Sequence, residues 1–353
     1  MSSATFYSSL IELERNRRDV PASSGSHDYP AKFPQSRYSP TKVISSLFLK
    51  PSDTFWIDDP NAGTDHKDYV LYIGCNVLQT PFLLMNCVNV LGKMGIDFAV
   101  VGGTNLCCGS PHLASGKVNA AESFDRRRMS FFSKFRPKAV IEWDESCNEF
   151  THLNTLRYLK PDYEIINIES FLASNLSLCD FNTVKSEKIA IHDHYGHNAR
   201  SIADFESPRR VLSAIPGVEI VEMAHSKHEA LECGFDLLSK DKRVAAMANE
   251  KLLDEAKDAG ARTLLVMWQA CYRTFARSEV THGIKTRHFI DIVAEALGYS
   301  GSSEDKYKEY KISKNVDRVL EESAENIRAN GYSVEEIRPY VERYLFGDEK
   351  AFC

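Results

Sequence analysis

An adjacent pair of cysteines, Cys107-Cys108, followed directly by Gly109, is the feature of the sequence best suited to chemistry. Neighbouring cysteines cannot form a disulfide with each other without strain, because their Cα atoms lie too close together. Both thiols can instead bind one polynuclear metal centre. Cys75 precedes the pair with 31 residues between them, and Cys147 follows it with 38 residues between them. Soft thiolates gathered from three separate segments are the ligands that an iron–sulfur cluster requires.

The composition indicates a globular protein and argues against two classes of function. The chain has 353 residues, of which 43% are hydrophobic and 26% are charged, and this length is enough for two domains. A net charge of −6 offers no broad basic surface for nucleic acid. No apolar run approaches the length of a membrane span, and the start of the sequence has no pattern of a secretory signal. Nine dispersed cysteines therefore predict metal-bound thiols in the cytoplasm rather than a disulfide framework.

From residue 69 the sequence alternates short apolar strands with helices. Strands are expected at Tyr69–Ile73, Asp97–Val101 and Ala139–Trp143, and helices at Thr80–Met94, Asn119–Phe135 and Asn148–Leu159. This alternation predicts a mostly parallel sheet. Each candidate cysteine follows a strand, so all of them should converge at the carboxyl edge of that sheet.

The same order of elements then repeats. Strands are expected at Lys188–Ile191, Val218–Met223 and Thr263–Met267, with helices at Ser207–Ala214 and Lys240–Ala259. The spacing also repeats, with 35 residues between Cys108 and Asp144 and 34 between Cys233 and Trp268. An internal duplication follows, with one lobe at residues 69–180 and a second at 181–300. Residues 1–68 form an N-terminal extension with helices expected at Thr5–Arg17 and Pro40–Leu49, and residues 301–353 form a helical C-terminal tail.

This arrangement resembles the CCG-domain signature, which occurs twice in the B-type subunits of heterodisulfide reductases and in related iron–sulfur proteins of glycolate and lactate oxidation. The resemblance covers about residues 69–275. The first lobe matches at Cys75, Cys107-Cys108-Gly109 and Asp144–Cys147, and the second matches at Tyr195, Glu232-Cys233-Gly234 and Trp268–Cys271, with His192-Asp193 before it. It implies two Rossmann-like lobes that each hold a non-cubane [4Fe-4S] cluster through five cysteines. It also implies two partners, a ferredoxin-like C-type protein and a flavoprotein of the A type from the same kind of complex.

The first lobe departs from the family pattern at one position, where Asp144 stands in place of a cysteine. We expect one iron–sulfur cluster bound by Cys75, Cys107, Cys108 and Cys147, and we assign the catalytic role to Cys107, Cys108 and Asp144. A carboxylate is a harder ligand than a thiolate and would leave its iron more open to substrate. The alternative is that Asp144 is a solvated loop acid that no longer binds iron.

The second lobe keeps only two of the five cysteines, Cys233 and Cys271, which do not hold a cluster by themselves. One interpretation is a degenerate lobe retained as scaffold. Another is a mixed site that binds a [2Fe-2S] unit or another metal, with the imidazole, carboxylate and phenol groups of His192, His194, His197, Glu232 and Tyr195 available nearby, His194 and His197 being the assigned histidine ligands. A third is a redox dithiol. His192 alone is expected to be a satisfied turn residue at the end of a strand.

The remaining candidates have simpler interpretations. Cys87 lies on the apolar face of its helix and is expected in the core, and Cys179 lies in the connection between the lobes without a motif. Cys353, the last residue, is expected to be an exposed thiol. The run Arg126–Arg128 is typical of a solvated helix face.

The leading hypothesis is a redox component of a heterodisulfide-reductase-like complex that acts on disulfides or thiols. Loss of cysteines in the second lobe fits a relative adapted to another sulfur substrate, by analogy a lipoate-bound sulfur species with a lipoyl carrier protein as partner. The second hypothesis is a non-catalytic electron-relay or assembly component of a dehydrogenase complex, and the third is a zinc or structural-metal protein. An open channel to Asp144 and Cys147 would favour substrate binding over relay.

Overall fold

The computed structural model describes residues 38–53, 65–194, 204–233, 241–299 and 305–347. Its first lobe is built on a four-stranded parallel sheet with the order β2-β1-β3-β4. The strands are β1 (Tyr69–Tyr72), β2 (Phe98–Val101), β3 (Ala139–Glu142) and β4 (Glu164–Asn167), and the helices are α4 (Pro81–Lys93), α5 (Ser110–Ala114), α6 (Val118–Ser133), α7 (Glu145–Leu153) and α8 (Ile168–Ser174).

The second lobe repeats this topology, with the strand order β6-β5-β7-β8, all parallel. Its strands are β5 (Glu187–His192), β6 (Val218–Val221), β7 (Thr263–Val266) and β8 (Lys285–His288), and its helices are α9 (Glu206–Ser213), α11 (Lys242–Asp258), α12 (Gln269–Phe275), α13 (Ser278–His282) and α14 (Phe289–Ala296). The predicted α/β class and the duplication are therefore confirmed. The boundaries given to the two lobes stay predictions.

The central strands are the ones that the sequence identifies best. β1 and β3 are flanked on both sides, and all four residues of β3 are buried, as expected for the middle of a parallel sheet. Helix α4 begins with Pro81 at its first position and buries a stripe that includes Leu84, Cys87 and Leu91. It ends before Gly95, which has a left-handed φ of 72°. The expected core position of Cys87 is confirmed.

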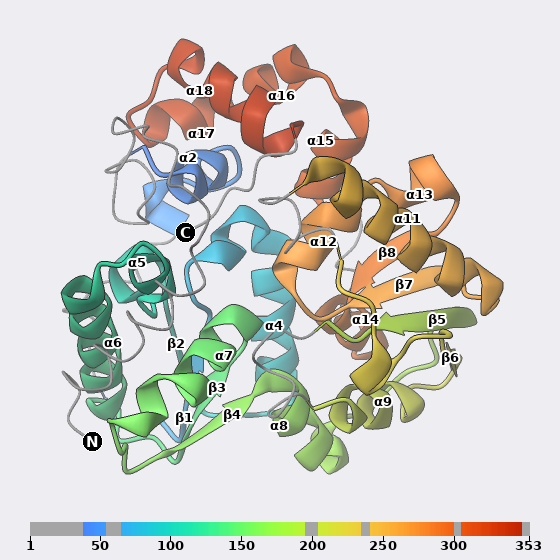
Figure 1. Cartoon of the computed structure of the whole chain (residues 1–353). Coiled ribbons are helices and arrows are strands. Elements are labelled where there is room, and N and C mark those ends of the chain that lie inside the picture. Colours follow the sequence, from blue (N-terminus) through green and yellow to red (C-terminus); the bar gives the residue numbers. More distant parts are fainter. Residues whose placement is uncertain (1–37, 54–64, 195–203, 234–240, 300–304, 348–353) are drawn as a thin grey trace.

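The two lobes share one continuous hydrophobic core and pack through α4 and α14, which lie side by side at the centre of Figure 1. Asn86 on α4 donates a hydrogen bond to Asp291 on α14 at 3.4 Å. At the carboxyl ends of β3 and β8, the rings of Trp143 and His288 meet edge to face at 6.0 Å. The sheet edges that carry the candidate sites therefore lie near the interface between the lobes.

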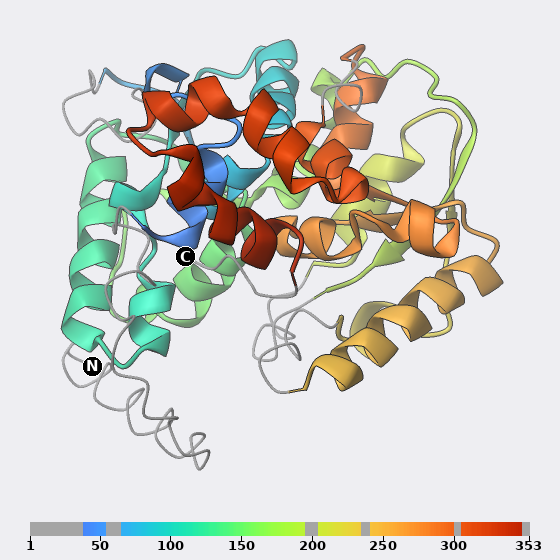
Figure 2. The same ribbon diagram turned by 90° about the horizontal axis from the view of Figure 1, so that it is seen from above.

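A helical C-terminal region, α15 (Lys306–Ser313) to α18 (Val334–Tyr340) with a last turn at Val341–Leu345, lies over both lobes (Figure 2). Helix α2 (Pro40–Ser45) packs into this region, and Asn326 and Asn330 donate hydrogen bonds to the carbonyls of Leu47 and Leu49. The helix expected at Thr5–Arg17 lies outside the described residues. In the part of the chain described here, none of the helices is long and apolar enough to span a bilayer.

Candidate metal centres

The structure brings the cysteines of the first lobe together at the carboxyl edge of its sheet. Cys75 follows β1, Cys107 and Cys108 follow β2, and Cys147 lies in the first turn of α7 after β3. All four are buried in one cluster of apolar side chains. Convergence is the consequence of parallel strands, because each strand delivers its cysteine to the same edge.

Cys108 lies at the centre of this group. Hydrogen bonds from the thiols of Cys107 and Cys147 hold the pKa of Cys108 well below its ordinary value, and the positive charge of Arg128 acts in the same direction. The thiol of Cys147 also lies 3.8 Å from the hydroxyl of Tyr72. The backbone N–H of Gly109 points at Cys107 Sγ, 3.5 Å away. A buried thiolate surrounded by further thiols is suited to binding soft metal ions.

Cys75 is held against the same group by the turn that precedes it. Gly74 has a left-handed φ of 65°, and a Cβ at this position would lie 3.1 Å from both Cys147 Sγ and Asp144 Cβ. Cys75 is disulfide-bonded in this structure, so it must be reduced before it can bind iron. The other described cysteines carry free thiols, namely Cys87, Cys107, Cys108, Cys147, Cys179, Cys233 and Cys271.

Asp144 is the N-cap of α7, where its Oδ1 accepts a hydrogen bond from the N–H of Cys147 at 3.3 Å. The side chain is only 3% exposed, so the alternative of a solvated loop acid is wrong. Burial, together with the negative charge of Cys108, raises the pKa of Asp144 to about 6. Asp144 therefore lies in the ligand group, and its binding to iron stays a prediction.

Gly109 completes the Cys-Cys-Gly motif for a steric reason. Its φ is 95°, and an added Cβ would lie 2.6 Å from the backbone carbonyl oxygen of Ala121 on α6. Only glycine fits a left-handed position that is in contact with another backbone. The tight turn lets α5 and α6 pack directly beside the cysteine pair.

Arg128 does not lie on a solvated helix face, as the sequence predicted for the run Arg126–Arg128. Arg126 and Arg127 are exposed, but Arg128 is fully buried and binds Asp125 at 2.6 Å and Glu142 at 3.2 Å. It also donates hydrogen bonds to Thr151 and Thr155. The guanidinium lies over the ring of Tyr72 at 5.2 Å. The prediction failed because α6 turns this one arginine towards β3 and α7, where Glu142 of β3 and Asp125 of α6 itself pair with it.

In the second lobe the structure assembles a smaller group, His192, His194, Cys233 and Cys271. All four side chains are buried, and one ligand atom from each lies within 4.8 Å of all the others. Cys233 Sγ lies 3.7 Å from Cys271 Sγ and 3.5 Å from His194 Nδ1. The contact with Cys271 and the nearby His194 lower the pKa of Cys233 well below its ordinary value.

His192 was one of several side chains offered to a mixed site, but by itself it was expected to be a satisfied turn residue. It is the last residue of β5, and neither ring nitrogen has a hydrogen-bond partner among the described residues, so the satisfied turn residue expected from the sequence is wrong. The signal was the spacing, because alternate residues at a strand end point to the same side and His192 and His194 are two apart. His197, the other predicted histidine, lies outside the described residues.

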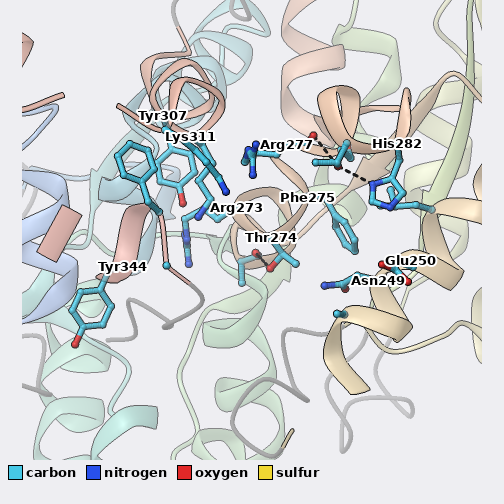
Figure 3. A pocket seen from close by; sticks show the side chains of 18 of the residues that line it. Asn249, Glu250, Arg273, Thr274, Phe275, Arg277, His282, Tyr307, Lys311 and Tyr344 are labelled. Atoms are coloured by element: carbon cyan, nitrogen blue, oxygen red, sulfur yellow. Dashed lines mark hydrogen bonds between the residues drawn. The ribbon is translucent and has the colours of Figure 1, made fainter. Parts of the chain in front are cut away.

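A pocket of about 350 Å³ lies between α11, α12, α13 and the C-terminal helices. In Figure 3, Arg273, Lys311, Tyr307 and Tyr344 lie on one side of it and His282 lies on the other. Arg273 is nine-tenths buried, and its Nη1 has no hydrogen-bond partner within the described parts of the chain. The guanidinium lies near enough to Asp144 of the first lobe for each charge to influence the other.

Comparison with known proteins agrees with the duplication. The CCG cysteine-rich domain model matches residues 69–150 and 194–276. The D subunit of the dihydromethanophenazine:CoB–CoM heterodisulfide reductase of Methanosarcina barkeri is 30% identical over 70% of this chain and 63% of its own length. The protein of the same name from Methanosarcina mazei is 26% identical over 69% of this chain and 62% of its own length. This chain thus spans slightly less than two thirds of these relatives.

Two further matches are weaker. The B subunit of the CoM/CoB fumarate reductase of Methanothermobacter marburgensis is 27% identical over 43% of this chain and 30% of its own length. A crystal structure of a hypothetical Helicobacter pylori protein aligns with a TM-score of 0.47 and 15% identity over 73% of this chain and 53% of that one, too distant to support a functional inference. The matches name the D-type protein of heterodisulfide reductase rather than the B-type protein that the motifs suggested. Both lobes therefore match the CCG cysteine-rich domain model, and the chain is homologous to the heterodisulfide reductase D subunit.

Proposed function

We propose that this protein is the iron–sulfur redox subunit of a cytoplasmic heterodisulfide-reductase-like complex, with one [4Fe-4S] cluster in its first lobe. Cys75, Cys107, Cys108 and Cys147 would bind the cluster, and Asp144 would be its fifth ligand. The observation that carries this proposal is the convergence of these five side chains at one sheet edge, in a region that matches the cysteine-rich domain. When bound, the cluster would supply one-electron chemistry and iron that can bind sulfur.

The surroundings of the five side chains fit a buried group with negative charge. Arg128 lies beneath the cysteines and Arg273 approaches Asp144 from the second lobe, so positive charge is placed on two sides. Tyr72 donates its hydroxyl proton to the carbonyl of Leu106 at 2.7 Å and so fixes the chain directly before Cys107. Preorganised charge of this kind influences the redox potential of a cluster.

The pocket beside Arg273 supports action on a substrate. The proposed ligands are almost fully buried, but the pocket reaches Gln79, four residues after Cys75, and Arg273, which lies near Asp144. A nearly buried arginine with an unpaired Nη1 among the described residues is suited to an anionic group on a disulfide or thiol substrate. Lipoate-bound sulfur on a lipoyl carrier protein is one proposed substrate, and ferredoxin-like and flavoprotein components are the proposed electron partners.

The first experiment is iron and acid-labile sulfide analysis with EPR on anaerobically purified protein. About four irons and four sulfides per chain are expected for one cluster. Cys147→Ser should lose most of this iron, whereas Cys179→Ser should retain it, because Cys179 lies away from both groups. Asp144→Cys should retain iron with an altered EPR signal. Zinc without sulfide in the first lobe would refute the proposal, and an unchanged EPR signal in Asp144→Cys would exclude that ligand.

A second experiment distinguishes substrate binding from electron relay. Because the proposed ligands are buried, a cluster that only relays electrons would also fit them. Arg273→Gln removes the charge but keeps a polar side chain in the pocket. We expect it to raise the KM for an anionic disulfide by about 10-fold or more, with iron content and reduction by an artificial donor unchanged. Equal KM values for Arg273→Gln and the parent protein would favour the relay function.

A further inference from the structure

We propose that the second lobe holds one mononuclear metal ion of the zinc type, bound by His192, His194, Cys233 and Cys271. Two thiolates and two imidazoles form a ligand set that favours zinc among the common protein metals. The four side chains come from three separate segments: the end of β5, the loop before residue 234, and the first turn of α12. A site of this kind would not duplicate the cluster proposed for the first lobe.

Two distances within the group match those around a tetrahedral ion. Zinc bonds of about 2.3 Å to sulfur and about 2.0–2.1 Å to nitrogen, at tetrahedral angles, place two sulfurs about 3.8 Å apart and a sulfur and a nitrogen about 3.5 Å apart. The structure has 3.7 Å between Cys233 Sγ and Cys271 Sγ, and 3.5 Å between Cys233 Sγ and His194 Nδ1. The ligand atoms therefore surround a space for one ion.

The same distances argue against a binuclear cluster. In a [2Fe-2S] centre with two cysteines and two histidines, the cysteines bind one iron and the histidines bind the other. Sulfur and imidazole nitrogen would then be separated by the whole cluster, whereas Cys233 and His194 are in contact. One divalent ion with two thiolates and two neutral imidazoles is also uncharged in total, as a buried site requires.

Neighbouring residues hold the two histidines in place. Asp193, between them, accepts two hydrogen bonds from Arg209 at 2.8 and 2.7 Å and a third from the N–H of Lys227 at 2.8 Å. The ring of Trp268 meets the ring of His194 at 4.3 Å, and Phe275 lies against His192 at 5.9 Å. An anchored backbone, aromatic walls and four protein ligands are typical of a structural metal site rather than a catalytic one.

The position of Cys271 gives such a site its role. Cys271 lies three residues after the N-cap Trp268 of α12, as Cys147 lies three residues after the N-cap Asp144 of α7. Helix α12 also carries Arg273, which lines the pocket and whose charge is influenced by Asp144. A metal ion that ties α12 to β5 would therefore fix the arginine that the second lobe presents to the first.

The test is metal analysis and X-ray absorption at the zinc edge on the anaerobically purified full chain. About one zinc per chain with two sulfur and two nitrogen ligands is expected. His192→Gln and Cys271→Ser should each raise the zinc Kd by more than about 100-fold, measured by competition with a chelator, while Cys179→Ser leaves it unchanged. Cobalt substitution of the unmodified protein needs no variant and should give the visible bands of tetrahedral cobalt with thiolate ligands.

Three results would overturn the inference: a four-sulfur shell, about eight irons and eight sulfides per chain, or a metal-free second lobe whose Cys233 and Cys271 form a disulfide. The proposal for the first lobe would be refuted by different results from those that refute the zinc site. Cys147→Ser should lose iron and retain zinc, and Cys271→Ser should lose zinc and retain iron. Loss of both metals in either variant would contradict independent sites.

Discussion

Replacing Arg128 by methionine should destabilise the protein by about 3–5 kcal/mol, the range for breaking a buried ion pair from one side. Arg128 is fully buried and makes four hydrogen bonds, two of them to the carboxylates of Asp125 and Glu142. Methionine fills a similar length but donates nothing, so both carboxylates would remain buried without a cation. The free energy of unfolding should then fall because two desolvated carboxylates are left without a positive partner.

The assay is urea unfolding under anaerobic conditions, followed by circular dichroism. Arg126→Met is a matched control on the same helix: Arg126 is about half exposed and pairs with Glu122 at 2.8 Å, so its loss should cost no more than about 1 kcal/mol. The triple variant Arg128→Met, Asp125→Asn, Glu142→Gln removes the stranded charges and should recover at least about 2 kcal/mol. A loss below about 1 kcal/mol in Arg128→Met, or no recovery in the triple variant, would refute the reasoning.

Three further predictions concern single positions. Gly109→Ala should destabilise by about 1–3 kcal/mol in the same unfolding assay and lower the iron content, because its Cβ would meet the carbonyl oxygen of Ala121; unchanged iron would contradict this. Burial raises the pKa of Asp305 from 3.8 to about 6, so the native state binds its proton more tightly and stability falls as pH rises through this range, by about 3 kcal/mol. Asp305→Asn lacks this loss, and its stability relative to the parent should rise by that amount between about pH 4 and 7; a flat difference would count against it. Cys87→Ala should keep all iron and lose about 1 kcal/mol of stability by leaving a small cavity, and iron loss would make Cys87 a ligand.

The fold could be predicted where strands are buried on both faces. β1, β3, β5 and β7 lie inside their sheets and carry continuous apolar runs, so their positions follow from the sequence. β4 and β8 were missed, although β2 and β6, which also lie at sheet edges, were predicted. β8 is the sequence Lys-Thr-Arg-His, which buries Thr286 and His288 and leaves Lys285 exposed. No hydrophobic run identifies a strand of that kind, and only pairing with β7 creates it.

The residues of the candidate sites also fall into those that the sequence predicted and those that it did not. Regular spacing identified the cysteines and Asp144, because the ends of parallel strands must meet. Arg128 was misjudged because its burial depends on how α6 packs against β3 and α7, which supply Glu142 and Thr151. Arg128 does carry a local signal, since it lies one helical turn before Phe132 and two turns after Ala121, both on the buried face of α6. A charge on a buried face indicates an internal ion pair.

The asymmetry between the lobes has a structural consequence for the whole protein. Both lobes place a cysteine in the first turn of the helix after their third strand, Cys147 on α7 and Cys271 on α12. Helix α12 also carries Arg273, whose charge is influenced by both Asp144 and Cys271. Without a metal ion, α12 would be held by packing and by hydrogen bonds such as that from Tyr272 to Asp305. In the proposed metal site, the two histidines and the remaining cysteines would anchor this helix, and through Arg273 the second lobe would support the redox site proposed for the first.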